Sequence, residues 1–417
     1  MGGVYLRDSI PPAMGWGLHR KTTMATHTQT AAFARNRGAW LMYLGAGYFN
    51  YFFNALGPAM PFIRAERDMS YTLGSLHFSA FAVGLLGGGF VGDRVARRLG
   101  ASGAFWLGAF GMGTGVLLLA LAPGALPSIA SAFLMGLLGS LILAILPAVI
   151  DSLFGEGRTV PLTKANIVAI ITAFMAPLLI GFAERGGLGW RVPLLLAAAC
   201  VFPMFAVFRS ARDGLLPADG SRPAGRRRLP LVYWAYWALL VCSVSIESCS
   251  IFWSADYMET HVGLPRDLAA SSVSLFLAAM LIGRVVGVGL VRRTTPLRLL
   301  FASLLVAGAG FLVYWLAGAA WLNVLGLFVT GLGVANLFPL TSSQAIAVAP
   351  GQSEAASARL ALASGSAVLL LPLLLGWSAD LLGIRLAYGI VGVLVIAGLL
   401  IRSFAARLTR GSAVDLP

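Results

Sequence analysis

Almost the whole chain divides into long apolar runs, separated by short polar or Pro/Gly-rich joints. A helix that crosses the hydrocarbon core of a bilayer needs about 20 apolar residues, and these runs reach that length. They lack the alternation in roughly ten-residue segments that is typical of membrane barrel strands. Charged residues make up 11% of the chain, whereas soluble domains carry about a quarter. The sequence therefore predicts an all-α integral membrane protein.

Twelve membrane-spanning helices are expected, six on each side of a polar segment. Their cores are 39–62, 71–92, 102–122, 128–150, 163–183, 191–209, 231–256, 268–290, 298–318, 320–344, 358–379 and 385–405. The same pattern predicts a cytoplasmic N-terminal tail (1–38), an N-terminal six-helix bundle (39–209), a cytoplasmic linker (210–229), a C-terminal six-helix bundle (230–405) and a cytoplasmic C-terminal tail (406–417). We expect the polar, basic N-terminal tail to be mostly disordered.

An internal repeat links positions that lie 195 residues apart. Gly88, Gly92, Arg97, Arg98, Pro177 and Gly181 correspond to Gly283, Gly287, Arg292, Arg293, Pro372 and Gly376. A repeat of six helices predicts two bundles related by a pseudo-two-fold axis, with a binding site between them near the middle of the membrane.

The net charge of +14 is distributed unevenly along the chain. Of the 30 lysines and arginines, 23 fall in segments on one side of the predicted spans, 6 on the other, and Arg284 lies within a span. Cytoplasmic loops carry such an excess, so we expect both termini in the cytoplasm of a cell membrane, most simply a bacterial inner membrane. This topology explains the basic charge without a nucleic-acid partner, and we expect a monomer.

A glycine-rich and basic segment, GFVGDRVARR, follows the second predicted span. Its glycines allow close approach of another helix, and its acid can bond a helix N-terminus or pair with an arginine. The cytoplasmic gate that we predict from it consists of Gly89, Asp93, Arg94, Arg97 and Arg98, with Arg284 from the other half. Alternatively, these basic residues only orient the helices, and Arg284 is structural.

Glu247 lies in the middle of the seventh predicted span. An ionisable group inside the membrane is costly and usually functional. Ser243 and Ser250 share its helical face, so we expect this face to look into a cavity. Glu247 is our candidate for substrate binding or proton coupling, and a structural glutamate that bonds neighbouring helices is the alternative.

Further polar and aromatic candidates for substrate binding lie in other spans. They are Asn50, Tyr51, Asn54, His77, Trp253 and Asn336. Asparagine both donates and accepts hydrogen bonds, which suits substrate hydroxyls or amides. Hydrogen bonding between helices is the alternative. No metal-ligand or nucleophile–base constellation stands out, so we expect no metal, no cofactor and no enzymatic activity.

The segment from Gly89 to Arg98 resembles the signature between helices 2 and 3 of the major facilitator superfamily, although Ala96 stands where that family usually has glycine. The C-terminal half is similar to the fucose–galactose–glucose:proton symporter branch, through Glu247, Trp253, Tyr257, Gly283, Arg284, Gly287, Phe338, Pro339, Pro372, Gly376 and Asp380. The resemblance implies the major facilitator fold and a secondary transporter of a small organic solute that works by alternating access, with proton coupling through Glu247.

Two features depart from that branch. Helix 1 has Asn50 and Asn54 where fucose permease-like members carry an acid, and the middle of helix 4 has no ionisable group. Sugar specificity, the coupling ion and the direction of transport therefore stay open. A drug or metabolite exporter working as an antiporter, and a non-transporting sensor or assembly component on the same scaffold, are the alternatives.

Overall fold

The computed structural model describes residues 17–209 and 229–412, which form helices without a strand. The N-terminal half holds α1 (Gly17–Glu66), α2 (Tyr71–Leu121), α3 (Ala125–Phe154), the short 3-10 helix η1 (Gly155–Arg158), α4 (Thr159–Arg185), α5 (Arg191–Ala199) and α6 (Val201–Phe208). The C-terminal half holds α7 (Leu231–Thr260), α8 (Arg266–Val291), α9 (Pro296–Leu316), α10 (Ala320–Val334), α11 (Leu337–Ala347), α12 (Ser353–Leu382) and α13 (Ile384–Ser412).

Nine helical stretches of the described chain are long and apolar enough to cross a membrane. Two of them, Tyr71–Leu121 and Ala125–Arg185, have 51 and 61 residues, and each is long enough to cross twice. In α2 the turn between the crossings is at Gly100, whose φ of 73° breaks the helix. When these two stretches count as two crossings each, the nine stretches and α1 account for the twelve predicted spans, and the predicted fold class is confirmed.

The two ends of the described chain differ from the prediction. α1 begins at Gly17 rather than at residue 39, so the disorder expected for the N-terminal tail is wrong from Gly17 onward. Residues 17–38 contain no proline and several alanines, which favour helix. α13 likewise continues to Ser412, into the predicted C-terminal tail. Residues 1–16, 210–228 and 413–417 lie outside the described residues, and with them most of the predicted linker.

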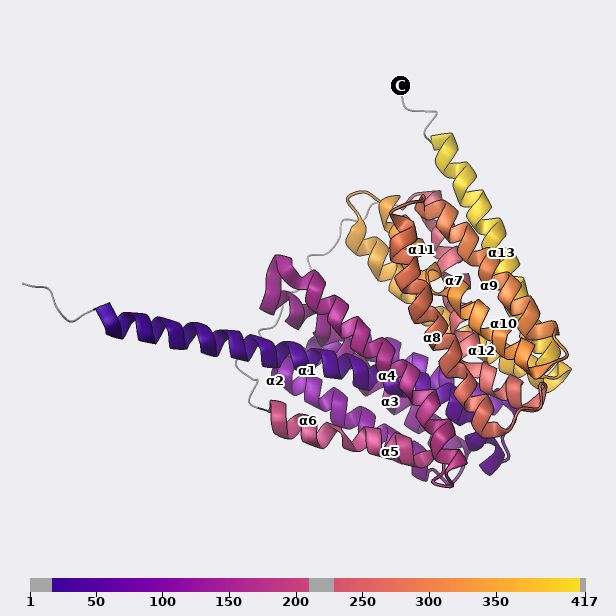
Figure 1. Ribbon diagram of the computed structural model, residues 1–417, viewed down its shortest axis with the longest axis horizontal. Helices are drawn as coiled ribbons and strands as arrows, with labels where there is room; N and C mark the ends of the chain where they lie inside the picture. The colour runs from indigo at the N-terminus through magenta and orange to yellow at the C-terminus, as the bar shows by residue number, and fades with distance from the viewer. Residues whose placement is uncertain (1–16, 210–228, 413–417) are drawn as a thin grey trace, which may run out of the picture.

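Helices α1–α6 and α7–α13 form two bundles that meet like the arms of a V (Figure 1). Across the interface α1 packs on α7, α2 on α12, and α4 on α8. We call the end where the arms meet the closed side; there α1, α4, α7 and α12 end and α2 and α8 begin. The arms diverge toward the open side, where α6 ends and α7 begins (Figure 1).

Position within the bundles decides how much of each span is buried. In α7, next to the interface, 83% of the most apolar 18-residue stretch is buried. In the span formed by α5 and α6, only 17% of the corresponding stretch is buried. Large apolar side chains such as Phe202, Val285 and Leu400 remain 65–67% exposed. Water-soluble proteins rarely expose extended apolar surface of this kind, and contact with lipid accounts for it.

The repeat predicted from the sequence corresponds to paired contacts across the interface. Ser79 of α2 donates its hydroxyl to the carbonyl of Leu369 in α12 at 2.8 Å. Ser274 of α8 donates to the carbonyl of Phe174 in α4, also at 2.8 Å. Both the two donors and the two acceptors are 195 positions apart in the sequence. The α2–α12 and α8–α4 contacts are therefore equivalent seams of a pseudo-symmetric molecule.

The pseudo-two-fold axis passes between α1 and α7. Gly57 and Phe252 are also 195 positions apart, and they contact each other. A Cβ on Gly57 would lie 2.7 Å from the Cα of Phe252, so a residue with a side chain would force the two backbones apart. Glycine at position 57 therefore allows the backbones of α1 and α7 to come into contact.

Candidate functional site

A polar cavity of about 90 Å³ lies between the two bundles. Its polar lining consists of Asn50 and Asn54 from α1, Glu247 from α7 and Arg284 from α8. Apolar residues of the same helices and of α4 complete it. The structure thus brings together three predicted substrate residues with Arg284, which we had assigned to the gate. Arg284 therefore lines the central cavity in this conformation, and its role at the gate stays a prediction.

The two charged residues of this cavity have few partners. Glu247 forms no hydrogen bond or ion pair with any described residue, although Arg284 lines the same cavity. The Arg284 Nε makes one long contact, 3.4 Å, with the carbonyl of Ala335. Both side chains are partly buried, and charged groups withdrawn from water are normally paired or hydrogen-bonded. A carboxyl and a guanidinium left this open can bind a ligand or a proton.

The two asparagines use one end of each side chain within α1. The Asn50 Nδ2 donates to the carbonyl of Ala46, and the Asn54 Nδ2 donates to the carbonyl of Asn50, both at 2.9 Å. No described residue donates to either Oδ1. Because the amide oxygen has two lone pairs, each asparagine keeps an acceptor for a ligand in the cavity.

An aromatic layer separates the cavity from the closed side. Phe53 lines the cavity and packs on Phe252 with 5.4 Å between ring centroids. Phe252 stacks on Phe78 of α2 at 4.3 Å, and Phe78 meets Trp253 edge-on at 5.6 Å. The Trp253 indole donates to the carbonyl of Pro372 at 3.0 Å. Trp253 therefore seals the interface between α2, α7 and α12 and does not line the cavity.

Three other predicted residues, Ser243, Ser250 and Tyr51, do not line the cavity. Ser243 and Ser250 are buried and donate at 2.8 Å to carbonyls one turn earlier in α7. Tyr51 donates to the carbonyl of Pro193 at 3.2 Å. It lines a different hollow of about 870 Å³, bounded by α1, α4, α5 and α6, whose walls are almost wholly apolar. We favour the smaller cavity as the site because it alone of the two holds charged and amide groups.

His77 and Asn336 both bond to neighbouring helices. The His77 Nε2 lies 2.8 Å from the hydroxyl of Ser128 in α3, and its Nδ1 lies 3.0 Å from the carbonyl of Leu73. The Asn336 Nδ2 donates to the carbonyl of Gly283 at 2.9 Å, which fixes the break between α10 and α11 against α8. These contacts use both ring nitrogens of His77 and the amide nitrogen of Asn336.

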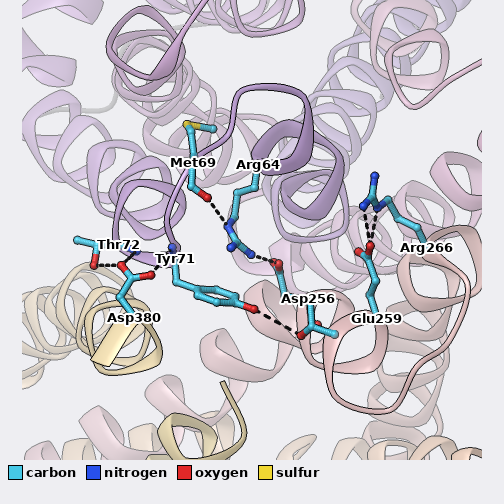
Figure 2. A network of polar contacts seen from close by, with 9 residues as sticks. Arg64, Met69, Tyr71, Thr72, Asp256, Glu259, Arg266 and Asp380 are labelled. Atoms are coloured by element: carbon cyan, nitrogen blue, oxygen red, sulfur yellow. Dashed lines mark hydrogen bonds and ion pairs between the residues drawn. The ribbon is translucent and has the colours of Figure 1, made fainter. Parts of the chain in front are cut away.

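A network of charged residues holds the closed side (Figure 2). Arg64 at the end of α1 forms an ion pair with Asp256 in the last turns of α7. Its guanidinium also covers the ring of Tyr71 at 3.6 Å, and its Nε donates to the carbonyl of Met69 at 3.3 Å. The side chain of Asp256 is 1% exposed. This pair links the two halves across the α1–α7 contact.

Asp380 and Asp267 hold the two seams that flank this pair. Asp380 of α12 accepts hydrogen bonds from the backbone N–H groups of Tyr71 and Thr72, each at 2.8 Å, and from the Thr72 hydroxyl at 2.5 Å (Figure 2). A carboxylate at the first turn of α2 is favourable, because free N–H groups point outward there. In the other seam, Arg185 of α4 pairs with Asp267 of α8 at 3.1 Å.

The predicted cytoplasmic gate lies on the open side. Asp93, Arg94, Arg97 and Arg98 are exposed. Asp93 has no ion pair or hydrogen bond with any described residue, and Arg94 donates only to the carbonyl of Phe90 in its own helix. In this conformation the gate residues are therefore apart from the other half, and their role stays a prediction.

The closed-side network was not among the sequence candidates. Arg64 entered the prediction only as a loop charge, and Asp380 only through the family resemblance. One signal was available: Asp256 is an acid at the end of an apolar span, where an ionisable group needs a partner. Nothing in the sequence indicated that this partner would be Arg64, 192 positions away.

Comparisons with known proteins bear on this arrangement. The family model of the Major Facilitator Superfamily matches residues 40–350. An uncharacterised MFS-type transporter of Yersinia pestis is 24% identical over 211 residues, and the match spans 49% of this chain and 54% of that protein, about half of its length.

Solved structures give a broader match. A bacterial homologue of the human lysosomal transporter Spinster, in an inward-facing and unoccupied conformation, aligns with a TM-score of 0.73 at 14% identity, over 90% of this chain and 97% of that one. The nucleoside transporter NupG aligns at 0.73 and 11% identity, over 89% of this chain and 99% of that one. At these identities the likeness shows the fold alone.

Proposed function

The chain belongs to the Major Facilitator Superfamily, and from that premise we propose that it is a secondary active transporter that moves a small organic solute across a bacterial inner membrane by alternating access. The observation that carries the proposal is the polar cavity between the bundles, which the aromatic layer separates from the closed side. Asn50, Asn54, Glu247 and Arg284 would bind the solute there.

The orientation predicted from the basic residues indicates which state of the transport cycle this conformation represents. With both termini in the cytoplasm, the closed side faces the outside, and the protein is inward-facing. The closed-side network would break in the outward-facing state, and Asp93 with its neighbouring arginines would then close the cytoplasmic side. The solute drives this exchange only if its affinity differs between the two states.

Coupling to protons is the second part of the proposal, and Glu247 is its carrier. We expect Glu247→Gln to abolish accumulation driven by a pH gradient and to spare counterflow, because solute exchange needs no net proton movement. Purified protein in liposomes, loaded with a transported solute, measures both. The matched control is Glu156→Gln in η1, which changes an exposed carboxyl outside the cavity and should leave both activities intact. Unchanged accumulation by the Glu247 variant would remove Glu247 from the coupling mechanism.

The solute is found by thermal stabilisation of the purified protein against a panel of small metabolites. A ligand at 100 times its dissociation constant stabilises the folded state by about 2.7 kcal/mol, which raises the melting temperature measurably. Each stabilising compound is then tested for uptake and for efflux in liposomes. Stabilisation without transport in either direction would favour the sensor alternative over a transporter.

A further inference from the structure

The guanidinium of Arg284, the charged donor among the described residues that line the central cavity, has few hydrogen-bond acceptors. Its Nε makes one contact of 3.4 Å, and no described residue accepts from its two Nη atoms. Its planar fork of N–H groups matches the two oxygens of a carboxylate. No ion pair joins it to Glu247, although both residues line the same cavity. The space between the two charges is therefore open to a ligand.

We propose that the cavity takes a small monocarboxylate, that Arg284 binds its carboxylate group, and that one proton enters on Glu247 with each solute. This inference rests on the proposed transport function and names its substrate class. The oxygen of Asn50 or Asn54 then accepts a hydrogen bond from a hydroxyl group on the same solute, because both Oδ1 atoms lack a donor among the described residues.

Charge balance in the cavity gives the coupling. When it is empty, the carboxylate of Glu247 and the guanidinium of Arg284 sum to zero. A bound monoanion would add one buried negative charge, and an uncompensated buried charge costs several kcal/mol. Protonation of Glu247 restores neutrality, so solute and proton enter together in a ratio of one to one.

Among the described residues, Glu247 and Arg284 are the charged side chains that line the cavity. The lining from α1 and α4 is asparagine, phenylalanine, alanine and isoleucine, and that from α8 is otherwise leucine and methionine; α10 to α13 contribute none of it. The protonation of Glu247 therefore depends on the charge of Arg284 and on the charge of the ligand.

Size limits the solute in this conformation. A water molecule needs at least about 10–15 Å³ of such a cavity, so 90 Å³ admits a carboxylate with a small substituent. Suitable probes are two carboxylates and their uncharged carboxamides: lactate and lactamide, and pyruvate and pyruvamide.

The experiment measures binding and uptake of these four probes by the full-length protein, in detergent and in liposomes. At least one carboxylate should bind and be taken up, about tenfold or more in preference to its carboxamide, since a hydrogen bond to a charged group contributes about 1.5–3 kcal/mol. Its affinity should fall as the pH rises in the wild type and should become independent of pH in Glu247→Gln. Equal binding of acid and amide, or an affinity of the wild type that ignores pH, would overturn the inference.

Variants of the arginine separate charge from shape. Arg284→Gln should lose the preference for the carboxylate, and Arg284→Lys, which keeps the charge without the planar fork, should retain part of it. Arg292→Gln, an exposed arginine at the end of the same helix, is the matched control and should behave as the wild type. Gel filtration and melting temperature confirm that each variant is folded. A folded Arg284→Gln protein with unchanged carboxylate uptake contradicts the inference.

Failure of this inference differs from failure of the proposed function. Transport of a solute that has no carboxylate, found in the metabolite panel, overturns the inference and leaves the transporter intact. No transport of any stabilising compound overturns the proposed function itself.

Discussion

At the scale of single residues, the ion pair of Arg64 and Asp256 is the contact on which the closed side most depends. Asp256 is almost fully buried, and its Oδ2 has no hydrogen-bond partner among the described residues. Removing one partner of such a pair leaves the other charge buried and costs about 3–5 kcal/mol, whereas replacing both by apolar residues is often neutral. The pair therefore makes closure sensitive to the loss of either residue.

Asp256→Ala should accordingly destabilise the closed side. We expect a lower melting temperature and faster reaction of a cysteine placed at Ile251, which lines the cavity, with an impermeant maleimide added from the closed side. A background with Cys200→Ser removes the exposed native thiol. The double variant Arg64→Met/Asp256→Leu is the control and should recover most of the melting temperature. Equal labelling rates with and without Asp256 would show that the pair does not hold this side.

At the scale of elements, the sequence predicted the helices and their grouping into two sixes, because apolar length and the repeat are local properties. It predicted less of what each polar residue contacts. Ser243 and Ser250 share a face with Glu247, yet their hydroxyls bond to their own helix. The position of Arg284 along α8 predicts a gate residue. The packing of α7 beside α8, however, places Arg284 in the same cavity as Glu247. Such pairings follow from how helices pack, which one sequence does not reveal.

Gly376 shows how a single residue positions two elements. A Cβ at this position in α12 would lie 2.7 Å from the Cβ of Ser75 and 2.8 Å from the carbonyl oxygen of Tyr71 in α2. We expect Gly376→Val to push α12 from α2, at a cost of about 1–3 kcal/mol, and to lower the melting temperature. Gly289→Val on α8, where the added Cβ meets open space, is the control. If both variants melt alike, the α2–α12 seam tolerates expansion and does not set the closed side.

At the scale of the whole molecule, the two bundles are in contact at the closed side and apart at the open side. The main described contacts between the halves lie along α1–α7, α2–α12 and α4–α8, and α1 also contacts α8. The exposed acid and arginines after the second span have no partner from the other half in this conformation. Movement of the bundles as rigid bodies would therefore close one end as it opens the other.

Two pairs of spin labels test this movement. Leu188 and Trp321 are exposed loop or helix-end positions on the closed side, and Gly157 and Arg293 are their counterparts on the open side. When a transported solute is added under a pH gradient, the distance between the first pair should lengthen by several ångströms while that between the second shortens. Double electron–electron resonance measures both distances. Changes of the same sign in both pairs would rule out rocking about a central site.

The two seams also explain why a chain with an internal repeat needs both of its halves. Arg185 and Asp380 are equivalent positions, as are Thr72 and Asp267, so each seam has its acid on a different partner. A molecule built from two N-terminal halves would set the arginine against the positive end of α2, and one built from two C-terminal halves would set two aspartates face to face. Neither half can replace the other, because each seam needs one partner from each half, and selection therefore acts on the two halves together.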